Sequence, residues 1–415
     1  MKTSAFLYPW DVLGDPDAPA RIADLGVRQV TLASAYHSTR ALTPRHPGHR
    51  IVTAEHAAVL YPPSELYWRG RDLRPYASGS WAPGDAFGQA AQALAAAGLD
   101  VHSWVVLAHN SRLGAEHPAT SVVNAYGDRY PWAPCIAQPR VRGYLVALAA
   151  EAAVRPGALG VELESCGWYG LAHLHGHDKI AGVALEDTAQ YLMSLCFCPS
   201  CGYGYEEVGL KTEELREWVR RALEPVWRGG PLDPSGAELL AATLPFRTRV
   251  AQELQEAAVA AVRGRAGAGF QVLLHADPRP DRCGANVGVD AGHVLGVADG
   301  VVVPGGAGGT ELLRGFAARA AGGSVIAANV TVVSGMGGRP GALGRRRSGC
   351  GGVGRRNFGS ITWGWLRTGI WRWCGDRASR ADARRGLGLR PRPRIAPQRR
   401  SSSIAGRAEV LAGTE

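Results

Sequence analysis

The chain has 415 residues, a net charge of +10 and 46% apolar residues, a size that accommodates two or three average domains or one large α/β barrel. No apolar run approaches the ~20 residues of a membrane-spanning helix, and the first ten residues lack the apolar core of a signal peptide, so we expect no membrane partner. Eight cysteines, several of them closely spaced, favour a reduced, cytoplasmic protein over a disulfide scaffold in a chain of this size.

The positive charge is concentrated at one end of the chain. Residues 335–415 contain 18 arginines, no lysine and four acidic residues, so this segment carries +14 and the rest of the chain carries −4. Clustered basic residues are typical of nucleic-acid binding. We therefore expect no nucleic-acid partner unless the basic tail is a genuine part of the protein.

Short apolar segments alternate with helical segments along the first 334 residues. The predicted strands are residues 6–10, 27–35, 100–108, 158–165, 270–274, 300–303 and 324–333. The predicted helices between them are residues 18–25, 86–99, 140–153, 213–223, 246–263 and 311–321. This alternation predicts a parallel sheet with crossover helices. Seven units, with an eighth to be found, favour an α/β fold of the (β/α)8 TIM barrel type over an open sheet.

Residues 335–415 break the alternation. Three consecutive arginines at 345–347, four tryptophans within 363–373 and an Arg/Pro/Ser-rich end match neither a strand nor an amphipathic helix. One hypothesis is a disordered basic arm. The other is a frameshift, since residues 356–376 read in another frame can encode a strand, a loop and a helix start. We predict a barrel domain of residues 1–334, lacking its last unit if the frame is shifted, and a tail of residues 335–415.

Two glutamates lie in the fourth predicted strand, and active sites of such barrels form where the strands end. Glu162 and Glu164 are two residues apart and therefore point to the same side of the strand. Isolated buried charge is costly, so each carboxylate needs a partner or a function. Glu162 lies one pleat deeper and is predicted to be a paired interior charge, whereas Glu164 is the candidate general acid/base.

Asp277 follows the fifth predicted strand and is the other carboxylate at a strand end. Glycoside hydrolysis needs two carboxyl groups flanking the scissile bond, one protonated and one ionised. Glu164 as the acid and Asp277 as the base or nucleophile satisfy this requirement. The residues predicted to bind the sugar are His37, His109, Asn110 and His275, with Trp168 or Tyr169 as a stacking surface.

A metal-dependent hydrolase is an alternative function. It would use residues from the same strand ends: His37, His109, His275 and Asp277. Metal-dependent barrels of this kind resemble one another in a His-x-His on the first strand, and residues 6–10 contain none.

Three cysteines follow the fourth strand with the spacing of metal ligands. Cys196, Cys198 and Cys201 place three thiolates on a short loop, and structural zinc is held by four ligands, usually Cys or His. Reduced cysteines without a metal are the alternative. The candidates for a fourth ligand are Cys135, Cys166, His173, His175 and His177.

This part of the chain resembles a known family. The run Cys135-Ile-Ala-Gln-Pro139, followed by a helix, a strand ending in a carboxylate and the motif Cys196-Phe-Cys-Pro-Ser-Cys201, looks like the bacterial β-galactosidases of glycoside hydrolase family 42. These are retaining (β/α)8 enzymes in which one cysteine joins a later Cys-x-Cys-x-x-Cys to bind structural zinc. The resemblance implies Glu164 as the acid/base and a structural zinc held by Cys135, Cys196, Cys198 and Cys201.

The resemblance covers residues 124–206, and the chain departs from the family pattern at three places. Leu163 stands where the family has Asn before the catalytic Glu, and the gap from Glu164 to Cys196 is longer. The seventh predicted strand ends at Val332-Val-Ser-Gly335 without the carboxylate that would be the nucleophile. A barrel that binds sugar without cleaving it is therefore a further alternative. The sequence predicts a carbohydrate substrate and leaves open whether the chain forms a homo-oligomer.

Overall fold

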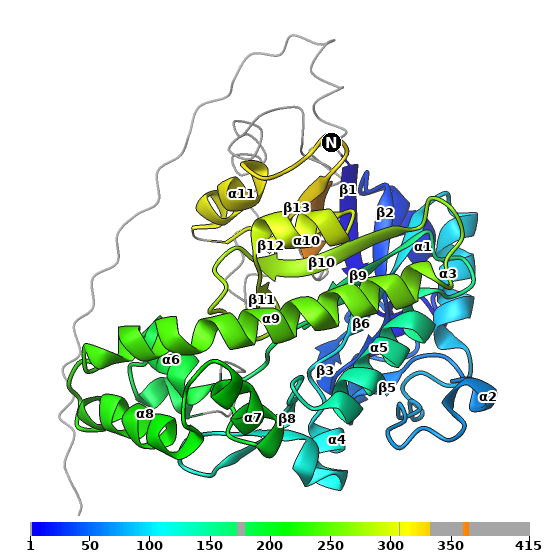
Figure 1. Cartoon of the computed structure of the whole chain (residues 1–415). Helices are drawn as coiled ribbons and strands as arrows, with labels where there is room; N and C mark the ends of the chain where they lie inside the picture. Colours follow the sequence, from blue (N-terminus) through cyan, green and yellow to red (C-terminus); the bar gives the residue numbers. More distant parts are fainter. Residues whose placement is uncertain (1, 172–178, 307, 333–359, 365–415) are drawn as a thin grey trace, which may run out of the picture.

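The computed structural model describes residues 2–171, 179–306, 308–332 and 360–364. Within these residues, eight parallel strands lie at the centre of the molecule (Figure 1) and form a closed ring, because each strand pairs with the next and the last pairs with the first. In order around the ring, the strands are β1 (Lys2–Leu7), β2 (Gln29–Tyr36), β6 (Asp100–Val106), β9 (Gly160–Glu164), β10 (Gln271–Asp277), β12 (Gly300–Pro304), β13 (Val325–Thr331) and β14 (Ser360–Gly364).

The closing strand, β14, comes from residues 335–415, which the sequence assigns to a separate tail. Its backbone pairs in parallel with β13 on one side and with β1 on the other. The fold is therefore the predicted α/β TIM barrel. The rest of the predicted tail lies outside the described residues, so its disorder or shifted reading frame stays a prediction.

The strands place alternate side chains inside and outside the ring. Outward residues such as Val30 and Leu274 belong to the large hydrophobic core between the strands and the helices. Inward residues form smaller apolar clusters, one around Trp104 and one around Leu273. The interior of the ring is therefore filled by aromatic, aliphatic and polar side chains.

Helices cover the outside of the ring. Figure 1 shows α9 lying across the strands, with α5 packed alongside it. Helix α3 begins where Asp85 accepts a hydrogen bond from the N–H of Gly88. Helix α5 begins at Pro139, which lacks an N–H, but the N–H groups of a first turn have no partner within the helix. The outer helices are α1 (Ala18–Ala23), α3 (Ala86–Ala96), α5 (Pro139–Ala153), α9 (Ser235–Arg263), α10 (Ala291–Val297) and α11 (Gly309–Ala317).

Segments after β6 and β9 form a lobe against the first half of α9 (Figure 1). It contains α4 (Ser111–Glu116), the 3-10 turns η2 (Pro118–Thr120) and η3 (Ile180–Gly182), the hairpin β7 (Ser121–Val123) and β8 (Arg129–Pro134), and α6 (Asp187–Met193), α7 (Pro199–Glu207) and α8 (Thr212–Trp227). The long connection after β2 holds β3 (Thr39–Leu42), β4 (Ile51–Ala54), β5 (Ala58–Val59) and α2 (Glu65–Trp68). The short strand β11 (Val287–Gly288) pairs in parallel with the end of β10.

Two elements depart furthest from their predicted bounds. The first strand ends before Pro9, which opens a 3-10 turn, η1 (Pro9–Asp11), in which the carboxylate of Asp11 accepts the N–H of Tyr8. Helix α9 begins eleven residues before the predicted start and continues through Pro245. Leu239 is buried ahead of this proline, so packing of the helix face outweighs the local cost of proline.

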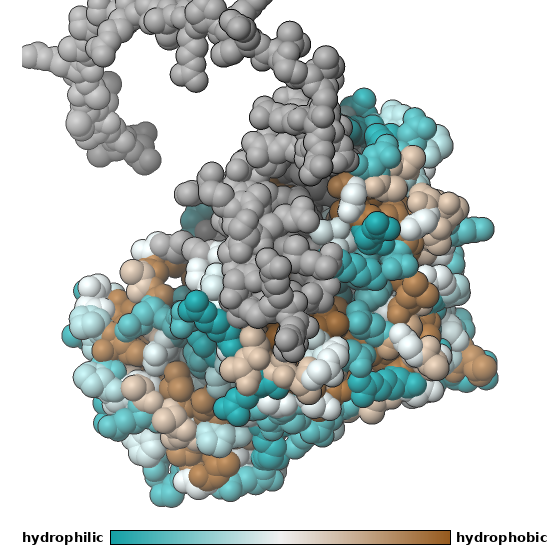
Figure 2. Space-filling view, turned by 90° about the horizontal axis from the view of Figure 1, so that it is seen from above, coloured by the Kyte–Doolittle hydropathy of each residue, from teal (hydrophilic) through white to brown (hydrophobic). Residues whose placement is uncertain are grey.

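The surface of the described residues is mixed in character. On the face shown in Figure 2, hydrophilic residues lie among hydrophobic ones. Among the residues that the structure describes, no helix has both the length and the apolar character of a membrane span.

Candidate functional site

Glu164 is the last residue of β9, and its side chain lies in a buried setting at the C-terminal end of the ring. The residue is 8% exposed. Its Oε2 accepts a hydrogen bond of 2.7 Å from Nε1 of Trp104, and Nδ1 of His275 lies 3.9 Å from the same oxygen. Burial raises the pKa of Glu164 above its ordinary value, and the contacts with His275 and Trp104 offset part of this rise. A carboxyl group in this state suits a general acid.

A chain of polar contacts continues from His275 into the ring. Nε2 of His275 lies 3.1 Å from Oε2 of Glu162, whose Oε1 accepts a hydrogen bond of 2.7 Å from Thr31. The Thr31 hydroxyl in turn lies 3.1 Å from that of Ser4. Burial opposes charge on His275, but the hydrogen bond to Glu162 and the charges of both glutamates raise its pKa above the ordinary value. Glu162 is thus the paired interior charge that the sequence predicts.

An aromatic cluster surrounds Glu164, and the sequence analysis did not identify it. The ring of Trp104 lies 4.7 Å from Phe6 and 4.6 Å from Tyr36, and Tyr8 lies 4.8 Å from Tyr36, between ring centroids. Burial raises the pKa of both tyrosines well above its ordinary value, so their hydroxyl groups stay protonated and able to donate. The aromatic run at the end of the first strand was the available signal in the sequence.

Two predicted sugar-binding histidines lie together in an aromatic row. The ring of His37 stacks on Tyr36 at 4.2 Å and lies 4.9 Å from His109, and His109 stacks on Tyr169 at 4.6 Å. Each histidine also uses a ring nitrogen to contact a backbone carbonyl, Ser38 O at 2.7 Å and Trp132 O at 3.1 Å. The row joins the Glu164 cluster through Tyr36, which also contacts Trp104.

Asn110 and Trp168 make local structural contacts. The Asn110 side chain caps α4 by accepting the N–H of Leu113 at 2.9 Å. The indole N–H of Trp168 donates to the carbonyl of Arg247 at 2.8 Å, and the Arg247 guanidinium lies over its ring. Trp168 is 5% exposed, which leaves little surface for a sugar. A sugar-binding role for either residue stays a prediction.

Asp277 lies in an ion-paired network at the end of β10. Its two oxygens accept from Nε and Nη2 of Arg279 at 2.9 and 2.7 Å, and Arg282 lies 3.9 Å away. Arg279 and Arg282 also pair with Asp187. This network lines a cleft of about 350 Å³ between β10 and α6. A carboxylate in a bidentate arginine pair is held in one orientation, so attack on a substrate would require it to leave this pair.

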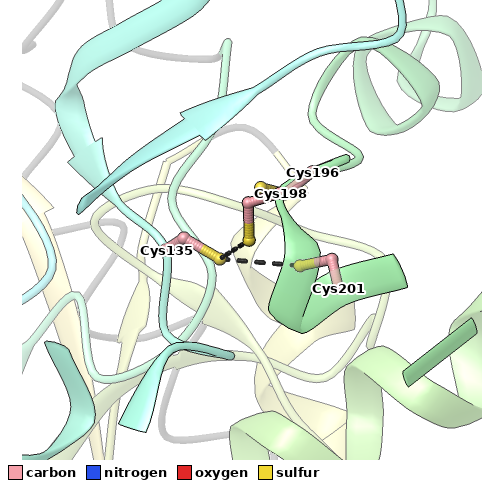
Figure 3. A group of neighbouring side chains, drawn as sticks. All are labelled: Cys135, Cys196, Cys198 and Cys201. Carbon is pink, nitrogen blue, oxygen red and sulfur yellow. Dashed lines mark hydrogen bonds between the residues drawn. The ribbon is translucent and has the colours of Figure 1, made fainter. Parts of the chain in front are cut away.

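Four cysteines form a buried cluster in the lobe beside β9 (Figure 3). Their sulfur atoms all lie within 4.8 Å of one another, and Sγ of Cys135 lies 3.7 Å from that of Cys198 and 3.5 Å from that of Cys201. Sulfurs at about 2.3 Å from a tetrahedral zinc are about 3.8 Å apart. The group therefore could hold a metal ion. Its members are Cys135, Cys196, Cys198 and Cys201.

The cluster joins segments that are far apart in the sequence. Cys135 directly follows β8, whereas Cys198 caps α7 and Cys201 lies in its first turn. Hydrogen bonds from the neighbouring thiols lower the pKa of Cys198, whereas thiol contacts raise the pKa of Cys135, and burial together with thiol contacts raises the pKa of Cys201. A divalent cation would replace the thiol protons.

Other proposed metal ligands do not gather in the described part of the chain. Cys166 lies outside the cluster, and burial raises its pKa to about 12. His275 is bonded to Glu162, and Asp277 to Arg279, so with His37 and His109 they do not form a ligand group among the described residues. Nothing in these residues therefore favours the metal-dependent hydrolase. The histidines at 173, 175 and 177 lie outside the described residues.

No family model matches the sequence, and no curated protein matches it. The fold does match solved structures. An α-L-fucosidase isoenzyme 2 from Paenibacillus thiaminolyticus superposes with a TM-score of 0.54 and 13% identity, over 93% of this chain and 50% of the fucosidase. A β-galactosidase from the psychrophilic Marinomonas ef1 superposes with a TM-score of 0.52 and 11% identity, over 92% of this chain and 60% of the β-galactosidase.

A GH42 β-galactosidase from G. stearothermophilus gives a TM-score of 0.52 and 12% identity, over 91% of this chain and 56% of that chain. This chain thus spans 50–60% of the length of these three solved structures. At these identities the likeness concerns the fold. The chain has the (β/α)8 fold that these glycoside hydrolases share, and the likeness does not single out family 42.

Proposed function

We propose that the chain is a glycoside hydrolase that uses Glu164 as its general acid/base. The observation that carries the proposal is the setting of Glu164. It ends a barrel strand, is nearly enclosed, and has a pKa raised by burial while Trp104 holds one of its oxygens. The likeness of the fold to solved glycosidase structures supports a carbohydrate as the substrate class.

The residues around Glu164 would each contribute to this reaction. The protonated carboxyl would deliver its proton to the glycosidic oxygen as the bond breaks. The hydroxyls of Tyr8 and Tyr36 bond to each other, so one of them would donate a hydrogen bond to a sugar oxygen. His37 and His109 would bind hydroxyl groups further along the row. The aromatic side chains around Glu164 would exclude water from the bound sugar, which would strengthen each of these contacts.

Asp277 is proposed as the second carboxylate, the base or nucleophile, although its pair with Arg279 would have to open. That same pair favours the second candidate function, a barrel that binds sugar without cleaving it. The two candidates differ in whether substrate binding is followed by bond cleavage.

We also propose that the cysteine cluster holds a structural zinc. Four buried thiol groups at tetrahedral spacing support zinc over harder cations, which prefer oxygen ligands. When bound, the ion would supply a cross-link between the end of β8 and the start of α7. The free state of the cysteines among the described residues supports a reducing compartment, and we propose the cytoplasm.

The test is a screen of 4-nitrophenyl α- and β-glycosides, including α-fucosides and β-galactosides, with wild type, Glu164→Gln and Glu253→Gln. Glu253 is a partly exposed residue of α9, so its variant controls for the loss of a carboxylate. We expect Glu164→Gln to lower kcat/KM for the preferred glycoside about 10²–10⁴-fold and Glu253→Gln to leave it unchanged.

Equal activity of wild type and Glu164→Gln would refute the assigned role. Binding is measured in parallel by calorimetry with the corresponding free sugars. A wild type that binds a sugar but releases no nitrophenol from any glycoside would favour the second candidate.

A further inference from the structure

The imidazole of His275 lies between two carboxylates of the same strand. Nε2 is 3.1 Å from Oε2 of Glu162, and Nδ1 is 3.9 Å from Oε2 of Glu164. A neutral imidazole carries one N–H and donates in one direction, whereas an imidazolium carries two and donates in both. All three side chains are buried, and two buried carboxylates without a cation would be costly. A doubly protonated ring fits this geometry, with Nε2–H hydrogen-bonded to Glu162 and Nδ1–H at ion-pair distance from Glu164.

The surroundings of the three residues come from several strands. On β2, Thr31 donates to Glu162, and on β6, Trp104 donates to Glu164. On β1, the ring of Phe6 lies 5.7 Å from the ring of His275, and on β12 its register partner is Val302. These neighbours are neutral.

The titratable groups around the three residues are aromatic. His102 on β6 interacts with Glu162, and burial lowers its pKa to about 4, so it is neutral at pH 7. The phenols that interact with Glu164 have raised pKa values and are neutral as well: Tyr8, Tyr36 and Tyr169. Of these groups, His275 is the one placed to carry a positive charge between the two glutamates.

We propose that Glu162 and His275 form a positioning pair for Glu164, in which Glu162 holds a proton on Nε2 and the ring presents Nδ1–H to Oε2 of Glu164. Trp104 donates to the same oxygen. Trp104 is hydrogen-bonded to Oε2 and Nδ1 of His275 lies at ion-pair distance from it, so both face this oxygen and Glu164 carries its exchangeable proton on Oε1. The consequence for hydrolysis rests on the proposed function of Glu164, whereas the protonation of His275 does not.

NMR of protein labelled with ¹⁵N-histidine tests the pair in the full chain. Loss of one signal in His275→Gln assigns the ring among the twelve histidines. We expect both nitrogens of His275 to be protonated at pH 7 in wild type. Glu162→Gln should lower the proton affinity of His275 at least tenfold, and Thr31→Val, which keeps the carboxylate, should leave it unchanged or raise it.

A neutral His275 ring at pH 7 in wild type would overturn the proposal, and this result needs no variant of Glu162 to fold. An unchanged titration of His275 in a folded Glu162→Gln would also overturn it.

The pH profile of hydrolysis separates this proposal from the proposed function. If the pair positions Glu164, Glu162→Gln moves the limb of kcat/KM that reports Glu164 to higher pH, because a neutral His275 no longer favours the carboxylate. A merely structural role of Glu162 would lower activity without moving the limb. A doubly protonated His275 in a protein without any hydrolysis would support the pair and count against the hydrolase function.

Discussion

Trp104 donates its indole N–H to Oε2 of Glu164 at 2.7 Å, from the neighbouring strand of the barrel. Both residues are buried, so this bond is a main compensation for a carboxyl group withdrawn from water. The relationship links the stability of the barrel to the protonation of its candidate catalytic residue.

Trp104→Phe removes the donor and keeps an aromatic ring against Phe6 and Tyr36. The variant should lose about 1–3 kcal/mol of unfolding free energy at pH 7, since a buried carboxyl group loses its hydrogen-bond donor. The loss should be smaller at pH 4 than at pH 7, because a protonated carboxyl group needs this donor less than an ionised one does. Urea unfolding at both pH values measures it. Trp132→Phe is the matched control, because its indole donates to the neutral carbonyl of Gly170 and its loss should not depend on pH.

Glu164→Gln should change how stability depends on pH. The pKa of Glu164 is raised in the folded state, so its ionisation opposes folding once the pH exceeds the ordinary value near 4.5. Glutamine never ionises and escapes this cost. The variant should therefore be at least as stable as wild type at pH 7, and its advantage should shrink as the pH falls towards 4. Thermal unfolding from pH 4 to 8 measures it, and an advantage that grows at low pH would contradict the raised pKa.

The cysteine cluster should contain one zinc ion per chain, measured by elemental analysis of the purified protein. Removal of the ion with a chelator should destabilise the lobe, because the ion would join β8 to α7. Cys198→Ser should lower the zinc content and the melting temperature. Cys166→Ser is the matched control, since Cys166 is equally buried but lies outside the cluster, and it should keep its zinc. Full occupancy in Cys198→Ser would refute the proposed site.

The closing strand can be tested by comparing chains that end after residue 334 and after residue 364. The longer chain keeps β14, which pairs with both β13 and β1. We expect it to unfold cooperatively like the full chain, whereas the shorter chain should lose cooperativity and become sensitive to proteases. Equal behaviour of the two would show that β14 does not close the barrel. Sequencing of codons 335–376 tests the shifted reading frame independently.

The sequence by itself was enough to predict the barrel, because each strand–helix unit can be recognised from a short stretch of sequence. A buried strand and a helix are each predicted from the spacing of apolar residues along the chain, and seven such units indicate the architecture. Glu164 could be selected in the same way, as a carboxylate at the end of a buried strand. The Cys-x-Cys-x-x-Cys spacing is also local, so three of the four clustered cysteines follow from the sequence pattern, and the family resemblance nominated Cys135 as the fourth.

The partners of these residues were decided by the tertiary structure. Trp104 and Glu164 are 60 positions apart, and His275 and Glu162 are 113 apart, so their contacts exist only once parallel strands are brought into register. Asp277 resembles Glu164 in the sequence, and Arg279, two residues further along, binds it locally. The fold then adds Asp187 to this network through Arg279 and Arg282. Local periodicity reports which residues are buried, whereas closure of the ring determines which buried groups meet.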